Sequence, residues 1–287
     1  MPISSYHKLC YKWFGSIAEN TVTKKMKTDL EQAHIDIRAA AYLSFVWVNT
    51  ILTGIISTIA VIIIVLIFSF SLVINLALLM LPVLITVFCY FLLLGLPASI
   101  AKSRAKKIDL YLPYALNFIS AMSSAGITPT EIFKSLSKQK IYGEIREEAL
   151  WIYRDVGLLG KDIISAMKAN IKRTPSEKFK EFLQGAVVTV QSGGALKAYF
   201  MNKADQYMRE NRVNQKQLIE SLGIMAEAYV TAAVAGVLLI LIILPLLMII
   251  SNRPASDLLI IYIFSFIVVP LIHVGFAVVL SSMSSKV

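Results

Sequence analysis

The chain has 287 residues and a net charge of +10, and 57% of its residues are hydrophobic while only 16% are charged. An ordinary soluble domain is roughly 45–50% apolar and about 25% charged. This composition therefore indicates a membrane protein and argues against a soluble enzyme. Its two cysteines, Cys10 and Cys89, and its three histidines form no disulfide framework and no zinc motif. We expect no catalytic residue, no metal and no cofactor.

Residues 1–41 are predicted to form cytoplasmic amphipathic helices. One stripe recurs at helical spacing and consists of Tyr6, Leu9, Cys10, Trp13 and Ile17. Trp and Tyr beside lysines are typical of a helix at the depth of lipid headgroups. A helix packed on the rest of the protein would show the same stripe, so both interpretations remain open.

Four membrane spans are predicted from three stretches that contain no Asp, Glu, Lys or Arg: residues 39–101, 228–252 and 258–285. One span needs about 20 predominantly apolar residues, so the first stretch holds two spans and each of the others holds one. We place spans 1 and 2 in residues 42–98, with a turn near Ser71 and Asn75. Spans 3 and 4 fall in residues 227–287, with an outer loop at 251–257 and a short tail.

The orientation of the chain follows from its basic residues. A cluster directly after span 2 is expected at the membrane surface and contains Lys102, Arg104, Lys106 and Lys107. Lys and Arg beside a span mark its cytoplasmic end. We therefore expect a multi-pass protein of the cell membrane with the N-terminus, the segment 99–226 and the C-terminal tail in the cytoplasm.

Residues 99–226 form the large polar segment, with 20 Lys and Arg against 12 Asp and Glu, a net charge of +8. Their apolar residues recur at spacings of three and four, as in Phe179, Phe182, Leu183, Ala186 and Val187, and strand-like alternation is absent from the sequence. The predicted fold is therefore all-α: a polytopic membrane protein with four transmembrane helices and a cytoplasmic helical bundle between spans 2 and 3.

Two helix starts are marked by the same motif. Thr128-Pro129-Thr130-Glu131 and Thr174-Pro175-Ser176-Glu177 each place Thr at the N-cap, Pro at the first helical position and Glu at the third. This is a capping box with proline in its favoured position. The repeat after 46 residues is compatible with two related helical halves, and equally with reuse of a good cap.

Motifs that resemble catalytic sites do not meet the requirements of those sites. Gly157 and Gly160 before Lys161 lack the spacing of a phosphate-binding loop and indicate a helix end followed by a new helix. Ser192 before Gly193 lacks the earlier glycine of a nucleophile elbow and indicates a break between helices. His273 is a lone ionisable residue in span 4, for which we expect a hydrogen-bonding role inside the bundle of spans.

The order of these elements resembles the type II secretion F-domain family, the inner-membrane platform proteins of type II secretion, type IV pili and archaeal surface filaments. The resemblance covers residues 110–250 and favours the TadC-like or archaeal layout. It rests on three segments: 112–129, 156–163 and 190–196. The motif positions are Pro113, Gly126, Pro129, Gly157, Gly160, Ser192, Gly193 and Leu196.

This resemblance implies a non-enzymatic platform that couples a cytoplasmic hexameric ATPase to the extraction and assembly of pilin-like subunits. Gln191 stands where metal-binding members often have Glu, so no metal site is implied. A single F domain implies a homodimer, a paralogous F-domain partner or half of a longer chain. As the ATPase dock we predict the basic residues Lys134, Lys138, Lys140, Lys172, Arg173, Lys178 and Lys180. Nucleic acid is not an expected partner, and the alternative function is a transporter or permease subunit.

Overall fold

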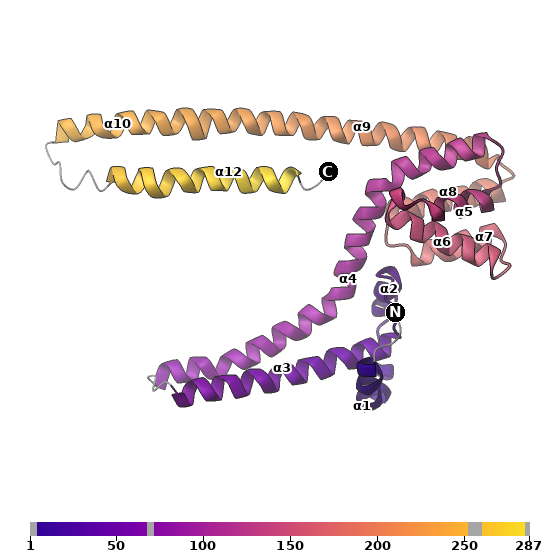
Figure 1. The fold of residues 1–287 in the computed structure, drawn as a ribbon, viewed down its shortest axis with the longest axis horizontal. Helices are drawn as coiled ribbons and strands as arrows, with labels where there is room; N and C mark the ends of the chain where they lie inside the picture. The colour runs from indigo at the N-terminus through magenta and orange to yellow at the C-terminus, as the bar shows by residue number, and fades with distance from the viewer. Residues whose placement is uncertain (1–4, 68–71, 252–259, 285–287) are drawn as a thin grey trace. The chain divides into compact units, whose positions relative to one another are not determined.

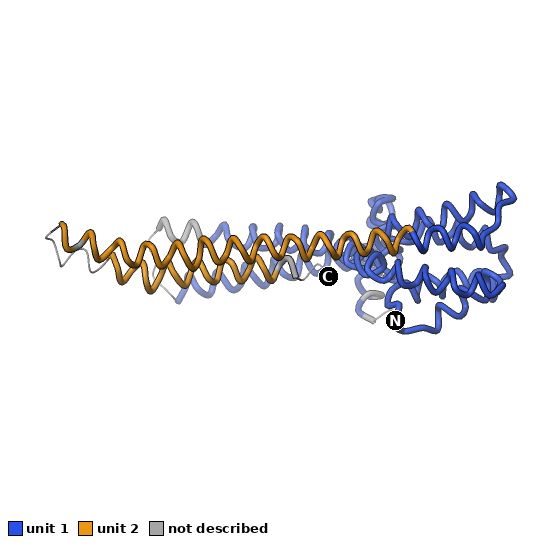
Figure 2. The backbone as a smooth tube through the Cα atoms, turned by 90° about the horizontal axis from the view of Figure 1, so that it is seen from above, with its two compact units in different colours: residues 1–205 blue, residues 206–287 orange. Residues whose placement is uncertain are grey.

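The computed structural model describes residues 5–67, 72–251 and 260–284, which fall into two compact units, 1–205 and 206–287 (Figure 2). Within these ranges the regular structure is entirely helical (Figure 1). Four helices are long and apolar enough to cross a membrane, and a helical domain lies between the second and the third. The predicted fold class is confirmed. Of the turn predicted near Ser71 and Asn75, residue 71 lies outside the described ranges, while Asn75 lies inside the helix Leu72–Ser124, so the turn does not extend to it. Of the outer loop predicted at 251–257, Ser251 ends a helix and residues 252–257 lie outside the described ranges, as do the last tail residues.

The N-terminal helix α1 (Ser5–Thr21) packs on α3 (Ala39–Ile67), the first apolar span. Its residues Cys10 and Ala18 are buried, and Ala18 packs with Ala40 and Leu43 of α3. The outer side of α1 remains apolar, because the side chains of Leu9, Trp13 and Ile17 are all more than half exposed. One face of α1 therefore packs on the protein, and the opposite face is apolar and exposed, as expected of a helix at the depth of lipid headgroups.

Helix α2 (Lys24–Gln32) ends in a Schellman motif with histidine at the position that glycine usually occupies. His34 has a φ of 56°, and its amide donates to the carbonyl of Glu31. The Ile35 amide donates to the carbonyl of Leu30, and the two side chains pack together. A non-glycine residue with positive φ is uncommon, so the fold holds His34 in a conformation that histidine rarely adopts.

Helix α4 (Leu72–Ser124) carries the second span directly into the bundle. At 1.5 Å per residue its 53 residues extend over roughly 80 Å. The helix continues through residue 98, where the sequence changes from apolar to basic. That change therefore marks a change of surroundings, not a helix end. Figure 1 shows α4 bending between the part beside α3 and the part in the bundle. Pro97 and Pro113 lie in this stretch, and proline is a common cause of helix kinks.

Pro97 leaves one backbone carbonyl without its helical partner, and α3 supplies the replacement. Because proline has no N–H, the carbonyl of Leu93 loses its bond from residue 97. The hydroxyl of Tyr42 donates to this carbonyl over 2.7 Å, and Tyr42 itself is buried. This bond ties the two spans together at the proline.

Replacing Tyr42 with phenylalanine is expected to lower the stability of the helix pair by about 1 kcal/mol, the usual net contribution of such a bond. The measurement is thermal unfolding of the full chain in detergent micelles, followed by helical circular dichroism. Tyr90→Phe is the matched control, because the described residues offer the Tyr90 hydroxyl no hydrogen bond. Equal midpoints for the two variants would remove the role given to Tyr42.

The bundle consists of α5 (Pro129–Lys138), the short η1 (Lys140–Tyr142), α6 (Glu144–Gly157), α7 (Ile163–Arg173), α8 (Glu177–Gln191) and the ends of α4 and α9 (Leu196–Tyr229). Apolar residues at helical spacing point inward from each helix, as predicted. The largest fully buried side chains of the bundle are Ile108, Leu112, Leu116, Ile119, Ile132, Phe133, Leu136, Ile145, Phe179, Phe182 and Phe200.

Of the two predicted capping boxes, the first has its residues at the predicted positions but lacks the capping bond, and the second is wrong because its helix begins two residues later. Thr128 is the N-cap of α5 and Pro129 follows it at the first helical position, but the Thr128 hydroxyl makes no capping bond. The N-cap of α8 is Ser176, not Thr174, and the Ser176 hydroxyl accepts from the Phe179 amide. The same hydroxyl donates to Asp109 of α4. This contact between helices selects Ser176 as the cap, and the apparent repeat does not extend to the structure.

The second unit contains most of α9, a π-helical turn η2 (Val230–Ala235), α10 (Gly236–Ser251), a second π-helical turn η3 (Phe264–Val268) and α12 (Val269–Ser284). His273 bonds through Nδ1 to the carbonyl of Val269, 2.8 Å away in its own helix. Its ring also meets Tyr229 edge to face, at 5.8 Å between centroids. Tyr229 lies on α9, so this contact links α9 to α12.

Candidate functional site at the base of the bundle

A buried charge network joins α4 to α6 where the spans give way to the bundle. Arg104 on α4 is only 6% exposed. Its Nε donates to Glu144 and its Nη2 to Glu148, both over 2.9 Å. Its third donor group, Nη1, bonds the carbonyl of Gln32 at the end of α2. One guanidinium therefore fixes three segments of the chain, which we call the Arg104 junction.

Electrostatics make this junction dependent on its arginine. Burial raises the pKa of the Glu148 carboxyl, and the Arg104 charge acts against that rise. His34 lies 3.9 Å from Glu148, but burial and then the Arg104 charge lower the pKa of its imidazole. His34 is therefore largely neutral near pH 7, and Arg104 is the main counter-charge of Glu148.

Trp151 of α6 forms a second cluster beside the junction. His34 stacks on its ring at 4.8 Å between centroids, which explains why a histidine is held in the strained turn after α2. The guanidinium carbons of Arg154 and Arg173 lie 4.8 Å and 4.5 Å from the ring centroid. Such cation–π contacts stabilise by about 0.5–2 kcal/mol.

Asp155 anchors this cluster from inside the bundle. Its Oδ2 accepts from Arg173 over 2.7 Å and from Lys161 over 3.3 Å. Burial alone would raise the pKa of Asp155, but the two cations outweigh it and hold the pKa below its usual value. Asp155 is therefore ionised at neutral pH, and it ties the end of α7 to α6.

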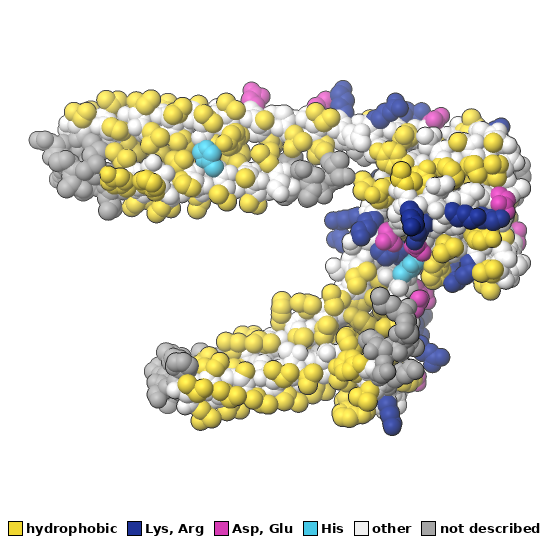
Figure 3. Space-filling model, in the orientation of Figure 1, with side chains coloured by type: hydrophobic (Ala, Val, Ile, Leu, Met, Phe, Trp, Pro, Cys, Tyr) yellow, Lys and Arg dark blue, Asp and Glu magenta, His cyan; other side chains and the backbone are white. Residues whose placement is uncertain are grey.

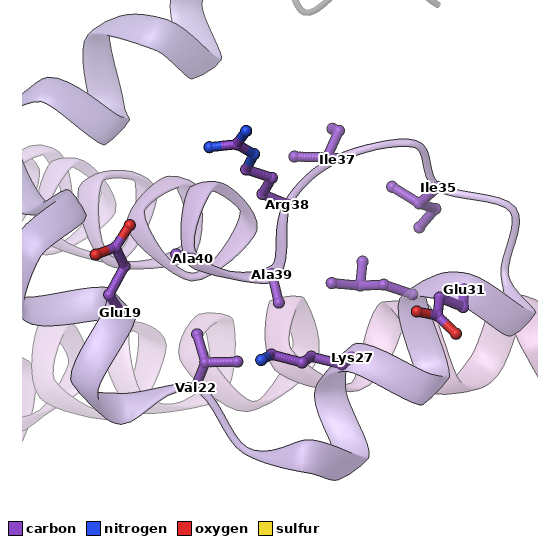
Figure 4. A pocket seen from close by; sticks show the side chains of 10 residues that line it. Glu19, Val22, Lys27, Glu31, Ile35, Ile37, Arg38, Ala39 and Ala40 are labelled. Atoms are coloured by element: carbon purple, nitrogen blue, oxygen red, sulfur yellow. The ribbon is translucent and has the colours of Figure 1, made fainter.

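The N-terminal segment contacts the bundle through Gln32 and His34, which lie at and just after the end of α2. Besides its carbonyl bond to Arg104, Gln32 donates through Nε2 to the carbonyl of Thr174, 3.5 Å away. A pocket of 360 Å³ opens beside this segment, lined by the charged residues Glu19, Lys27, Glu31 and Arg38 (Figure 4). Cations and anions alternate around it, so it shows no preference for one sign of ligand. No group of three or more His, Cys, Asp and Glu in the described ranges is placed to hold a metal.

The four residues predicted at the membrane surface do not share one environment. Lys102, Lys106 and Lys107 are exposed. The prediction is wrong for Arg104, because this residue is buried in the junction and its guanidinium is not available to a lipid headgroup. The reason lies in the helical repeat: its position faces α6, while those of the three lysines point outward.

The seven residues predicted as the dock also differ among themselves. Lys138, Lys140 and Lys172 are exposed, as is Lys178. Lys134 and Lys180 pair with Glu131 and Glu177 one turn earlier in their own helices. Arg173 is held by Asp155 and Trp151, which makes it part of the internal framework. Figure 3 shows blue and magenta side chains gathered on the bundle, while apolar side chains cover the spans of each unit.

The positions that carry the family resemblance lie at helix ends and turns, with one exception. Gly126, Gly160 and Gly193 have positive φ values of 80°, 64° and 74°. Pro129 begins α5, Gly157 ends α6, Ser192 caps α8 and Leu196 begins α9. The exception is Pro113, which is buried inside α4. These residues therefore define where the helices stop, not a reactive centre.

Comparison with known families identifies the bundle. Residues 115–244 match the family model described as type II secretion system protein F. This part of the chain is a type II secretion F domain. The match begins inside α4 and ends inside α10, so the F domain reaches into the third apolar span.

The curated relatives are archaeal. The chain is 38% identical over 136 residues to an uncharacterized protein of Methanocaldococcus jannaschii, covering 47% of this chain and 23% of that protein. It is 26% identical over 155 residues to Flagella accessory protein J of the same organism, covering 54% and 27%. Flagella accessory protein J of Methanococcus voltae is 26% identical over 140 residues, covering 48% and 25%. The aligned stretch is thus about a quarter of each relative. No solved structure matches the chain.

Together these findings describe a multi-pass membrane protein with an F domain between its second and third spans. The sequence resemblance to the F-domain family is confirmed. The sequence analysis assigns Arg104 to the membrane surface and Arg173 to the dock, and it does not predict the ion pairs that these two residues make with Glu148 and Asp155. Their signal in the sequence was the presence of Glu148 and Asp155 among the inward-facing positions of α6.

Proposed function

We propose that this protein is a membrane platform of a type IV filament or archaellum-like assembly machine. In this role a cytoplasmic hexameric ATPase docks on the F domain, and the spans help to move pilin-like subunits out of the bilayer into a filament. The protein would act without chemistry of its own. Both termini and the F domain would lie in the cytoplasm, and a second F domain would come from another copy or a paralogue.

The observation that best supports this proposal is the continuity between the F domain and the spans. The F domain begins within α4, whose earlier part is the second span, and it ends within the third apolar span. An unbroken helix transmits displacement better than a flexible linker. The Arg104 junction locks α4 to α6 at the point where it enters the bundle. A load on the bundle can therefore reach the second span.

The prediction for docking concerns the exposed lysines of α5 and η1. Charge reversal in the double variant Lys138→Glu/Lys140→Glu is expected to abolish co-purification of the ATPase and filament assembly. Complementary charges chiefly set encounter rate and register, and the two changes replace attraction with repulsion. The measurement is affinity purification from membranes in mild detergent, with filaments counted by electron microscopy.

The matched control reverses two exposed lysines elsewhere, Lys168 and Lys216, and so makes the same change in net charge. It is expected to assemble normally. Normal assembly by the α5–η1 variant at wild-type expression would refute this dock. Co-purification of a solute-binding protein in place of an ATPase would instead favour the permease alternative.

A further inference from the structure

An amphiphilic pocket of 480 Å³ lies in the first unit, where the turn between α1 and α2 meets the bundle-side ends of the first two spans. Its polar wall includes Thr23, Lys25 and Asp29 of the turn and α2. Its apolar wall includes Trp47 of α3 with Phe91 and Leu94 of α4. The pocket therefore has a charged rim on the bundle side and an apolar wall on the membrane side.

The charged rim offers one cation and one anion that have no ion-pair partner among the described residues. Lys25 and Asp29 are one helical turn apart, a spacing of roughly 5–6 Å between Cβ atoms. They form no salt bridge with each other, and the hydroxyl of Thr23 makes no capping bond. A ligand carrying both a phosphate and an ammonium group could satisfy both charges at this spacing. A polyanion would meet repulsion from Asp29.

The apolar wall is continuous with the membrane-facing surface of the spans. Phe91 is 64% exposed and Leu94 is 36% exposed, although both belong to a span. Trp47 and Tyr90 also line the pocket, and aromatic residues of this kind are enriched at the boundary between bilayer and water. An acyl chain that follows this wall would have its headgroup at the level of Lys25 and Asp29.

We propose that this pocket binds one phospholipid with a primary-ammonium headgroup, such as phosphatidylethanolamine. Its phosphate binds Lys25 and Thr23, its ammonium binds Asp29, and the upper part of an acyl chain lies along Trp47 and Phe91. Since Gln32 at the other end of α2 bonds Arg104, the lipid holds α2 between the bilayer and the Arg104 junction. The inference depends on the chain being embedded in a membrane and is independent of the proposed ATPase.

Trp47 provides the probe for this site, because bromine on an acyl chain quenches tryptophan at short range. Trp13→Phe removes the other tryptophan near the spans, while Trp151 lies in the bundle. The protein is placed in nanodiscs of phosphatidylcholine that contain a small fraction of dibrominated phosphatidylethanolamine. The reference sample contains the same fraction of dibrominated phosphatidylcholine. We expect the ethanolamine lipid to quench Trp47 several-fold more strongly.

Variants in the same Trp13→Phe background assign the headgroup contacts. Lys25→Ala is expected to weaken quenching by the ethanolamine lipid, and Asp29→Asn to remove its advantage over the choline lipid. The matched control is Lys24→Ala, an exposed neighbour on α2 that does not line the pocket. It should leave quenching unchanged.

Three results would overturn the assignment. Equal quenching by the two lipids in the Trp13→Phe parent would show that the pocket does not select an ammonium headgroup. The absence of any quenching would show that another protein segment covers Trp47. Stronger quenching by dibrominated phosphatidylglycerol than by the ethanolamine lipid would show an anionic-lipid site and refute the role of Asp29.

Discussion

Replacing Arg104 with methionine is expected to lower the free energy of unfolding of the bundle by about 3–5 kcal/mol, as is usual when one partner of a buried ion pair is removed. Methionine keeps much of the volume but none of the donors. Glu148 would remain buried without its main counter-charge, and the carbonyl of Gln32 would lose its bond from Nη1. The loss should loosen α2 together with α6.

The loss of unfolding free energy caused by Arg104→Met should be larger at neutral pH than in mild acid. Burial already raises the pKa of Glu148, and removing the Arg104 charge raises it further. Protonated Glu148 then supports the fold at pH values below the pKa of the unfolded chain. That support is lost as the pH rises through the higher pKa of the folded state. The variant should therefore lie closest to wild type in mild acid and furthest from it at neutral pH.

Thermal unfolding of the full chain in detergent measures this effect inside the bundle when it is followed by Trp151 fluorescence in a Trp13→Phe/Trp47→Phe background, which leaves Trp151 as the remaining tryptophan. Lys102→Met is the matched control, since Lys102 lies two residues before Arg104, is exposed and should change little. Adding Glu148→Gln to Arg104→Met should recover part of the stability by removing the buried charge. A variant as stable as wild type at neutral pH would show that the Arg104 junction contributes nothing to the fold.

The spans and the helical nature of the bundle could be predicted because each depends on a local pattern. A charge-free stretch of 63 residues allows two spans in any context. Repeats such as Phe179, Phe182 and Leu183 need only an apolar interior. The glycines at 126, 160 and 193 mark turns because positive φ favours glycine over other residues.

The Arg104 junction could not be predicted because its parts are distant in the sequence. Arg104 follows a span among lysines, where the positive-inside rule accounts for all four residues equally. Its partner Glu148 lies 44 residues further on, and Gln32 lies 72 residues earlier. Only tertiary packing decides which of the four cations faces α6. The shift of the α8 cap from Thr174 to Ser176 has a similar cause, since Asp109 of α4 binds the Ser176 hydroxyl.

Gly185→Ala is expected to destabilise the bundle by about 1–3 kcal/mol, the usual cost of overpacking a well-filled contact. Gly185 lies on α8, and the side chain of Tyr199 from α9 packs directly against it. An added methyl group would lie 2.1 Å from Tyr199 Oη and 2.7 Å from its Cζ, far inside van der Waals contact. Tyr199 cannot move aside freely. Its hydroxyl donates to the carbonyl of Phe182 over 2.8 Å, and its ring stacks on that of Phe182.

The protonation state of Tyr199 adds to this constraint. Burial raises the pKa of its hydroxyl to about 12, so the group remains a hydrogen-bond donor throughout the neutral range. Displacing the ring would leave the Phe182 carbonyl without this donor. Alanine otherwise favours a helix over glycine by about 1 kcal/mol. The expected loss is therefore a net effect in which the clash outweighs the gain in helix propensity.

A double-mutant cycle separates the clash from other causes. In a Tyr199→Ala background the space above Gly185 is empty, so Gly185→Ala should become neutral or stabilising there. Gly223→Ala is the matched control on α9, since nothing lies within 4 Å of its added methyl group. Thermal midpoints of the full chain in detergent give all the values. An equal loss from Gly185→Ala in both backgrounds would mean that Tyr199 does not set the approach of α8 to α9.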